Sequence, residues 1–330
     1  MSEKPKVAFY WCASCGGCEE AVVDLAEDIL KVVAAVDIVF WPVALDFKRS
    51  DVEAMPDKSI TVSFINGAIR TSEQEEMAQL MRRKSQLVIA FGSCSHTGGI
   101  PGLANLYESP DLLRRVYDET PTTDNPQGTR PQVRTVVPQG TVSLPYFGPS
   151  VKTLDQTVDV DYYLPGCPPP VKLIVGALTA LLEGKMPPKG SILAPNVALC
   201  DECPRKDSKP DKLLVKEFKR PHLAVIDPDK CLLEQGFLCL GPATRSGCGA
   251  ACIAGNMPCT GCGGPTDGVR DYGAKVLSAL ASIGEANEEE AAAALMAGIV
   301  DPTGTFYRYS LPASLLHRRV RGNGDGGAES

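Results

Sequence analysis

Thirteen cysteines are the residues of this 330-residue chain best suited to do chemistry. Their thiolates are soft ligands that suit zinc, copper and iron–sulfur clusters. Five of them are scattered over the first 190 residues, and the other eight fall between residues 200 and 262. Eight thiols so close together, among many glycines and prolines, are not typical of a packed hydrophobic core. Their distribution therefore predicts metal binding at more than one place.

Four of the N-terminal cysteines follow segments that are typical of β-strands. These cysteines are Cys15, Cys18, Cys94 and Cys167. The apolar runs before them, at 6–11, 87–91 and 158–164, predict parallel strands, and open α/β sheets bind ligands outside the carboxyl ends of such strands. We therefore expect the four thiols to form one tetrathiolate site, where the nearby glycines let the backbone approach an inorganic group. The alternative is that Cys94 and Cys167 are small buried hydrophobic residues.

Cys12 is one thiol more than this site needs. It lies three residues before Cys15 and closer to the first predicted strand. We interpret it as a buried free thiol, and the alternative is that it replaces one of the four ligands.

The eight C-terminal cysteines fit two further sites of four ligands each. Divided in chain order, they are Cys200, Cys203, Cys231 and Cys239, then Cys248, Cys252, Cys259 and Cys262. Spacing alone also allows an interleaved division. A C-x2-C pair serves both zinc and iron–sulfur sites. Three sites in series favour electron transfer, because one metal is enough for structure, and the spacing does not match a compact bacterial ferredoxin.

The elements that must position these thiols alternate between strand and helix in the first half. Predicted strands are 6–11, 36–44, 59–66, 87–91 and 158–164, and predicted helices are 19–34, 72–84 and 171–183. This alternation predicts a doubly wound parallel α/β sheet in a domain of residues 1–188. The helix at 72–84 has Thr71 or Ser72 as its expected N-cap.

The remaining segments have weaker periodicity. Residues 105–157 are rich in Pro, Thr and Gln, and we expect a long surface excursion there. Residues 189–330 predict a second, mostly irregular domain with helices at about 271–283 and 288–299 and a disordered tail. Asn287 and Glu290 have the spacing of a capping box for the second helix.

Composition excludes several classes of function. A net charge of −7 argues against nucleic acid as the main partner. No apolar run approaches the roughly 18 residues of a membrane span, and the N-terminus lacks the features of a signal peptide, so we expect a cytoplasmic protein. The three histidines, His96, His222 and His317, form no nucleophile–base arrangement, and the chain contains no P-loop.

Three segments resemble the proximal-cluster motifs of nickel–iron hydrogenase small subunits. They are Trp11-Cys-Ala-Ser-Cys-Gly-Gly-Cys-Glu19, Gly92-Ser-Cys-Ser-His-Thr-Gly-Gly-Ile100 and Leu164-Pro-Gly-Cys-Pro-Pro169. The run Cys239-Leu-Gly-Pro-Ala-Thr-Arg-Ser-Gly-Cys-Gly-Ala-Ala-Cys252, followed by Pro258-Cys-Thr-Gly-Cys262, extends the resemblance. It is closest to the small (gamma or G) subunits of the cytoplasmic, coenzyme F-420 non-reducing hydrogenases, also called methyl-viologen-reducing, which join a heterodisulfide reductase.

The resemblance implies a flavodoxin-like N-terminal domain and three 4Fe-4S clusters. The proximal cluster would be held by Cys15, Cys18, Cys94 and Cys167, the medial cluster by Cys248, Cys252, Cys259 and Cys262, and the distal cluster by Cys200, Cys203, Cys231 and Cys239. Many relatives have a histidine in place of Cys200, and many have a proline in place of Cys252 and hold a three-iron medial cluster. Four cysteines in each set imply three clusters of one type.

The same resemblance implies that the catalytic nickel–iron centre lies in a separate large subunit and that this chain holds no catalytic residue. Electrons would pass from that centre along the three clusters to an iron–sulfur electron-transfer subunit and heterodisulfide reductase. Glu19, next to Cys18, would tune the proximal cluster or assist proton movement at the subunit interface. The alternative is a solvated acid at a helix N-terminus.

Two other classes of protein compete with this interpretation. The 20 kDa-type subunit of complex I shares the flavodoxin-like domain and one cluster, but it has adjacent paired cysteines in its first motif and no eight-cysteine tail. A scaffold protein stapled by zinc would use the same thiols without electron transfer.

Overall fold

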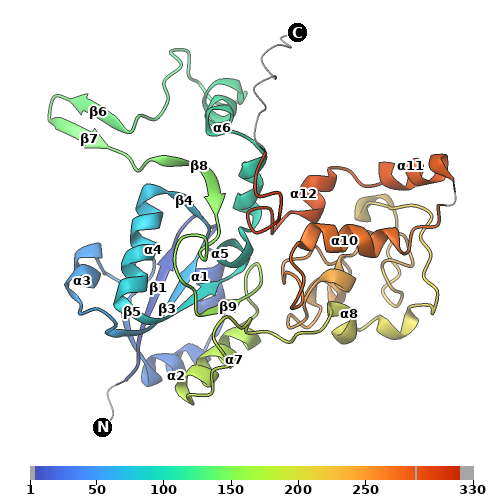
Figure 1. The fold of residues 1–330 in the computed structure, drawn as a ribbon, viewed down its shortest axis with the longest axis horizontal. Coiled ribbons are helices and arrows are strands. Elements are labelled where there is room, and N and C mark those ends of the chain that lie inside the picture. Colours follow the sequence, from blue (N-terminus) through green and yellow to red (C-terminus); the bar gives the residue numbers. More distant parts are fainter. Residues whose placement is uncertain (1–3, 287, 320–330) are drawn as a thin grey trace.

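Five parallel strands form the central sheet of the N-terminal domain in the computed structural model, which describes residues 4–286 and 288–319 (Figure 1). The strands are β1 (Lys6–Trp11), β2 (Asp37–Phe40), β3 (Ile60–Asn66), β5 (Ser85–Phe91) and β9 (Tyr162–Leu164). They lie in the order β2-β1-β3-β5-β9, and every neighbouring pair is parallel. Counted among themselves, the strands have the flavodoxin-like order 2-1-3-4-5. The predicted flavodoxin-like, doubly wound sheet is confirmed.

Helices cover both faces of this sheet, which explains the continuous apolar runs of its central strands. One face packs against α1 (Gly17–Val23), α2 (Asp28–Ala35) and α7 (Val171–Leu182). The other face packs against α3 (Arg49–Ala54) and α4 (Ser72–Lys84). Along β1 the side chains alternate between the two faces: Val7 and Phe9 join the first core, and Ala8 joins the second.

Local details differ from the predicted elements in several places. The predicted strand 158–164 extends only over Tyr162–Leu164. The predicted helix 19–34 is two helices, because Ala26 adopts a left-handed backbone with φ 51° between α1 and α2. The second strand is shorter than predicted and ends before Pro42, which has no N–H to donate to a ladder. The short α3 was not predicted.

The cap of α4 is as predicted: Gln74 N–H donates to Thr71 Oγ1, and Thr71 N–H donates to Gln74 Oε1.

The excursion at 105–157 contains more regular structure than its sequence predicts. After the 3-10 turn η1 (Ile100–Leu106) come α6 (Ser109–Arg114), the π turn η2 (Arg115–Glu119) and a hairpin of β6 (Arg134–Val137) and β7 (Gly140–Ser143). Figure 1 shows this hairpin standing away from the sheet, and Val136 is 82% exposed. The chain then returns through β8 (Phe147–Lys152), which pairs antiparallel with β4 (Ile69–Thr71), and Leu154 is fully buried.

The second domain is mostly irregular, as predicted, and has its own apolar core, which includes Phe237 and Phe306. Its helical segments are α8 (Leu199–Glu202), η3 (Lys206–Ser208), η4 (Pro221–Leu223), η5 (Gly241–Ala243), α9 (Ala251–Ala254), α10 (Tyr272–Ala281), α11 (Glu289–Ala297) and α12 (Pro302–Phe306). The two longer helices confirm the predictions at 271–283 and 288–299. The proposed Asn287 cap and the end of the tail lie outside the described residues. Across the described ranges, the structure has no helix long and apolar enough to span a bilayer.

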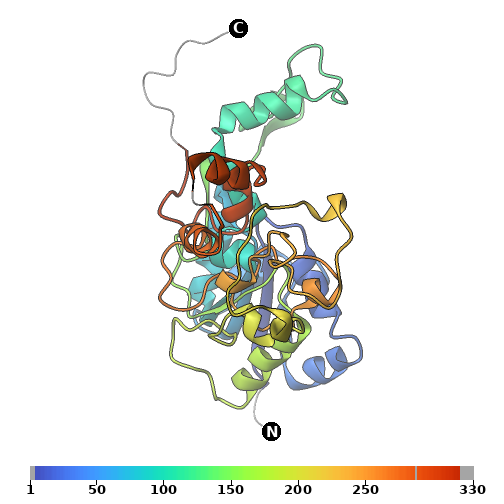
Figure 2. The same cartoon turned by 90° about the vertical axis from the view of Figure 1, so that its right-hand side faces the viewer.

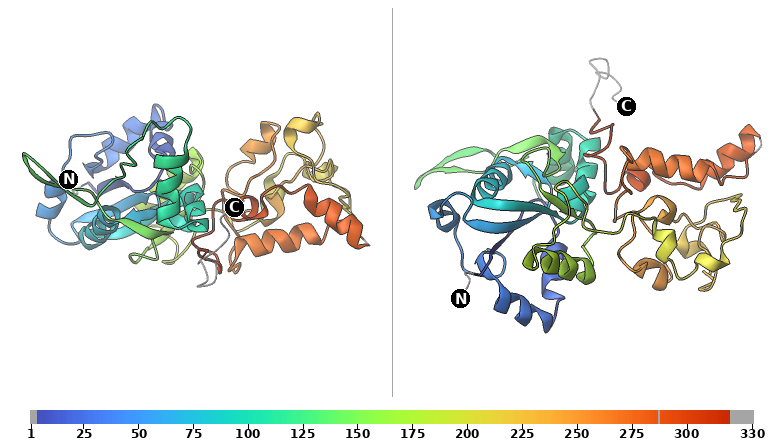
Figure 3. Two further views of the ribbon diagram at one scale, coloured as in Figure 1. Left: turned by 90° about the horizontal axis from the view of Figure 1, so that it is seen from above. Right: turned by 60° about the horizontal axis from the view of Figure 1, so that its bottom comes forward.

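The two domains lie side by side (Figure 3), and in Figure 2 the second domain faces the viewer while the excursion rises above it. Residues 191–193 still bond to the first domain, since Leu193 N–H donates to Tyr163 O at 2.7 Å. The boundary between residues 188 and 189 stays a prediction.

A C-terminal strap, residues 309–319, crosses back over the first domain. Pro312 packs against Gly98 and Gly102, and its carbonyl accepts a hydrogen bond from Gln156 Nε2 at 2.8 Å. Asn105 Nδ2 donates to His317 O at 2.9 Å, farther along the strap. The strap therefore ties the end of the second domain to the segment that follows β5.

Replacing Gly102 with alanine tests this packing. A Cβ atom at Gly102 would lie 2.4 Å from Pro312 Cδ, whereas one at Gly176, on the exposed side of α7, would meet no atom within 4 Å. We expect Gly102→Ala to lower the free energy of unfolding by about 1–3 kcal/mol through overpacking. Gly176→Ala should raise it by up to about 1 kcal/mol. Anaerobic thermal unfolding measures both, and a Gly102→Ala variant as stable as the parent would contradict the packing described.

Candidate functional site

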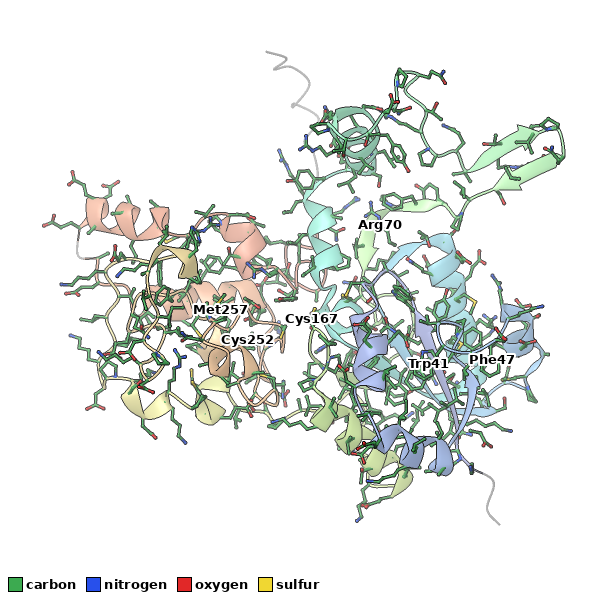
Figure 4. All side chains as sticks on the ribbon, turned by 180° about the vertical axis from the view of Figure 1, so that it is seen from behind. Trp41, Phe47, Arg70, Cys167, Cys252 and Met257 are labelled. Atoms are coloured by element: carbon green, nitrogen blue, oxygen red, sulfur yellow. The ribbon has the colours of Figure 1, made fainter. Side chains whose placement is uncertain are left out.

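The loops after three strands bring the four N-terminal thiols together. Cys15 and Cys18 lie at the start of α1 after β1, Cys94 lies in α5 (Ser93–Thr97) directly after β5, and Cys167 follows β9. Burial raises the pKa of the Cys18 thiol, and the negative charges of Cys94, Cys167 and Cys15 raise it further. The predicted strand-end grouping of these thiols is present in the structure, and Figure 4 shows Cys167 at the junction of the two domains.

Glycines pass directly beside these sulfur atoms. A Cβ atom at Gly92 would lie 2.4 Å from Cys18 Sγ, and one at Gly99 would lie 2.4 Å from Cys94 Sγ. Both glycines have positive φ, 85° and 57°, which other residues rarely adopt. The backbone can therefore approach this thiol group closely only because these positions have no side chain.

A second thiol group lies in the other domain and contains Cys200, Cys203, Cys231 and Cys239. Burial and then the charge of Cys239 raise the pKa of Cys200 to about 12, with smaller increases from Cys203 and Cys231 and a decrease from Lys209. Three of these cysteines line a cavity of about 190 Å³ whose other walls are mostly apolar. The structure thus brings the first half of the C-terminal cysteines to one place.

The third thiol group, Cys248, Cys252, Cys259 and Cys262, lies between the other two. The pKa of Cys262 is raised to about 11, mainly by burial. The charges of Cys167, Cys248 and Cys252 also raise it, whereas a hydrogen bond from Cys167 N–H lowers it. Burial and then the charge of Cys239 raise the pKa of Cys259. Cys262 therefore faces the first group and Cys259 faces the second.

The chemistry of these groups fits a resident metal cluster. All thirteen cysteines are free thiols. Buried thiols that raise one another's pKa cannot all ionise unless positive charge is supplied, and coordination to metal deprotonates a thiol outright. Within residues 4–286 and 288–319, no three His, Cys, Asp or Glu side chains converge closely enough to share a single ion.

Cys12 is separate from these groups. It is buried in the core on the α4 side of the sheet, whereas Cys18 joins the opposite core. Burial raises its pKa. This location agrees with a buried free thiol.

Glu19 is buried, so its interpretation as a solvated acid is wrong. The side chain is 4% exposed and accepts hydrogen bonds from Trp41 Nε1 and, at 2.6 Å, from Asn66 Nδ2. Burial raises the pKa of its carboxyl group, and the two hydrogen bonds lower it. The sequence did not identify Trp41 or Asn66 as partners, because they lie 22 and 47 residues away.

Arg205 was also missed. Its side chain is buried and donates to the carbonyls of Lys230 at 3.3 Å and Ile253 at 3.1 Å, which flank Cys231 and Cys252 in the chain. Its backbone N–H donates to Cys203 Sγ at 3.4 Å. Its guanidinium also donates to the neutral side-chain oxygen of Asn256 at 2.7 Å. This buried cation lies between the second and third thiol groups, where negative charge would stabilise it.

His96 also has a defined environment. It packs against Tyr163 in a tilted arrangement, with 4.7 Å between ring centroids and 38° between the ring planes, and burial lowers its pKa to about 4. It is therefore neutral at pH 7.

Comparison with known proteins connects this geometry to a family. A family model described as "NADH ubiquinone oxidoreductase, 20 Kd subunit" matches residues 15–181. The iron–sulfur G subunit of the F420-non-reducing hydrogenase of Archaeoglobus profundus is 40% identical over 96% of this chain and 98% of its own length. The G subunit of the F420-non-reducing hydrogenase of Methanothermobacter marburgensis is 36% identical over 98% of this chain and 100% of its own. The chain belongs to the G subunits of the F420-non-reducing hydrogenases.

Solved structures agree on the fold of this hydrogenase subunit. A chain of the reduced nickel–iron–selenium hydrogenase of Desulfomicrobium baculatum superposes with a TM-score of 0.52 at 19% identity, over 81% of this chain and 96% of that one. A chain of the corresponding enzyme of Desulfovibrio vulgaris Hildenborough gives 0.51 at 17% identity, over the same shares.

The full-length relatives decide against complex I. The family model ends at residue 181, before the last eight cysteines, whereas the hydrogenase G subunits align over nearly the whole chain. The chain is a small subunit of a nickel–iron hydrogenase, an oxidoreductase whose catalytic site lies in the large subunit, and it takes part in electron transfer.

The raised pKa of Glu19 predicts a pH dependence of stability. A free glutamate has a pKa of about 4.3, so above that pH the unfolded chain loses the proton while the folded chain still retains part of it. The contribution of Glu19 to stability therefore falls as pH rises from about 4.3 through its folded pKa. Compared with Glu19→Gln, the parent should lose stability as pH rises above about 4.3, as measured by anaerobic thermal unfolding.

Glu20→Gln is the matched control, because Glu20 is the next residue of the same helix and is exposed. It should follow the parent over the whole pH range. Parallel curves for the parent and Glu19→Gln would show that the folded pKa of Glu19 is not raised.

Proposed function

We propose that this small subunit holds three 4Fe-4S clusters and relays electrons between the nickel–iron centre of the large subunit and a partner protein. The proximal cluster would use Cys15, Cys18, Cys94 and Cys167, the medial cluster Cys248, Cys252, Cys259 and Cys262, and the distal cluster Cys200, Cys203, Cys231 and Cys239. The observation that carries this proposal is the order of the thiol groups, in which Cys262 faces Cys167 and Cys259 faces Cys239. A bound 4Fe-4S cluster supplies reversible electron transfer at a potential set by its charge, hydrogen bonds and exposure.

Direct hydrogen bonds join the segments that carry neighbouring groups. At the first junction, Ser93 Oγ, one residue before Cys94, donates to Cys262 O at 2.6 Å. At the second junction, Leu240 N–H donates to Cys259 O at 2.9 Å. No layer of side chains separates these ligand-bearing segments, which supports a continuous path across both domains.

Accessible thiols indicate where partners would bind. Cys15 of the proximal group and Cys252 of the medial group are exposed. The distal group lies in the second domain, where exposed Lys209 lines its cavity. We propose the large subunit at the proximal end, with an iron–sulfur electron-transfer subunit and heterodisulfide reductase beyond the distal end.

We also propose a division into residues 1–188 and 189–330 and a cytoplasmic location. None of the thirteen cysteines forms a disulfide, which is typical of a reducing compartment and supports the location.

Single cysteine variants test the ligand sets. Anaerobically purified parent should contain about twelve irons per chain, and Cys94→Ala, Cys239→Ala and Cys262→Ala should each lose up to about a third of them, because four irons depend on each ligand set. Cys12→Ala is the matched control and should keep all its iron. Metal analysis and the visible absorption bleached by dithionite provide the readouts. Colourless protein that contains zinc would contradict the proposal, and iron loss in Cys12→Ala would contradict the ligand assignment.

Affinity purification of the tagged chain from its host tests the partners. We expect a nickel-containing large subunit and heterodisulfide reductase to co-purify, because an electron relay needs a donor and an acceptor. Nickel analysis and peptide mass spectrometry identify them. Recovery of the tagged chain without any nickel-containing protein would contradict the hydrogenase assembly, and recovery with the large subunit and a different acceptor would contradict only the heterodisulfide reductase assignment.

A further inference from the structure

Tyr309, in the cysteine-free strap, contacts the segments that carry the first and third thiol groups. Its backbone carbonyl accepts hydrogen bonds from Gly99 N–H at 3.0 Å and from Thr97 Oγ1 at 2.6 Å. Thr97 ends α5, the helix that contains Cys94, and Gly99 passes beside Cys94 Sγ. The backbone of Tyr309 is therefore attached to the proximal side of the junction.

The side chain of Tyr309 reaches the medial side. Its hydroxyl lies 3.1 Å from Thr260 Oγ1, in a hydrogen bond that either atom can donate. Thr260 immediately follows Cys259 and lies two residues before Cys262. Burial raises the pKa of the Tyr309 hydroxyl; its bond to Thr260 lowers that pKa, and the charges of Cys262 and Cys167 raise it. The hydroxyl thus lies close to Cys167 of the first thiol group and to Cys262 of the third.

The neighbouring strap residues hold Tyr309 in this position. Three residues later, Pro312 fills the space above Gly98 and Gly102, and the Pro312 carbonyl is bonded to Gln156. Ser310 and Leu311, between them, are buried. Because the Tyr309 carbonyl is bonded to Gly99 and Thr97 and the residues that follow are buried, the tyrosine has little freedom to follow a movement of the medial loop.

We propose that Tyr309 is a positioning residue that sets the separation of the proximal and medial sites and so the rate at which electrons cross between the domains. The inference rests on the proposed function, since it concerns the junction between two of the proposed clusters. Its physical content is one bond: the hydroxyl of Tyr309 fixes Thr260, and thereby the Cys259–Cys262 loop, relative to the Cys94 loop. The tyrosine itself is neither oxidised nor reduced.

Two variants break this bond from opposite sides, Tyr309→Phe and Thr260→Val. In the assembled, anaerobic complex, each should keep the parent's iron content. Each should change the EPR splitting that arises from magnetic coupling between the reduced proximal and medial clusters. Each should also slow electron transfer from hydrogen to the distal cluster by about tenfold, within the range of losses caused by misplacements of about 1 Å.

Two further variants separate positioning from general stability. Thr260→Ser keeps the hydroxyl and should retain the parent's splitting and rate. Tyr307→Phe removes the hydroxyl of a nearby tyrosine that bonds to Asp271 inside the second domain, and it should leave the splitting unchanged.

The outcomes distinguish this inference from the proposed function. If the parent shows coupled clusters, while Tyr309→Phe and Thr260→Val keep its splitting and rate with full iron content, the positioning role is wrong and the relay stands. If the parent itself shows no coupled iron–sulfur signals, the relay and the positioning role both fail.

Discussion

The structure depends on the cost of placing many thiolates inside a protein. Charged sulfur is disfavoured in a low-dielectric interior, and neighbouring thiolates add repulsion to that desolvation. Here twelve thiols occur in three groups of four, and most of those with a resolved pKa have it raised by burial and by members of their own group. Positive charge must therefore enter with each group. In the proposed function an iron–sulfur cluster supplies it inside each group, and the buried Arg205 lies between the second and third groups, where it adds positive charge.

The fold meets this constraint differently in its two domains. In the first domain, a parallel sheet aligns three strand ends, and glycines next to the sulfurs leave space that any side chain would fill. In the second domain, the thiols lie in loops, and short helical turns and a small apolar core hold them. Two hydrogen bonds mark where the domains meet. Ser93, next to Cys94, donates to the carbonyl of Cys262, and Thr97, in the same helix as Cys94, donates to the carbonyl of Tyr309. In the proposed function, electrons cross the junction beside these contacts.

Much of the first domain could be predicted, because buried parallel strands leave continuous apolar runs and the cysteines follow them directly. The break between α1 and α2 could not, since Ala26 adopts φ 51° in a sequence that reads as one amphipathic helix. The hairpin of the excursion was also missed, because it lies in a segment rich in Pro, Thr and Gln, and its valines, such as Val136 and Val142, are exposed instead of packing in a core. In the site, the cysteines identified themselves by type, whereas Glu19, Arg205 and Tyr309 owe their environments to contacts between residues far apart in the chain, such as the 212 residues between Thr97 and Tyr309. Composition and periodicity do not record such contacts.

An experimental structure of the anaerobic complex, with anomalous diffraction recorded on both sides of the iron absorption edge, would test the central claim most directly. The account predicts three iron peaks along one path, each surrounded by one of the three four-cysteine sets, with the medial peak between Cys167 and Cys239. Zinc peaks in place of iron, fewer than three iron peaks, or a cluster ligated by cysteines from two of the sets would contradict it.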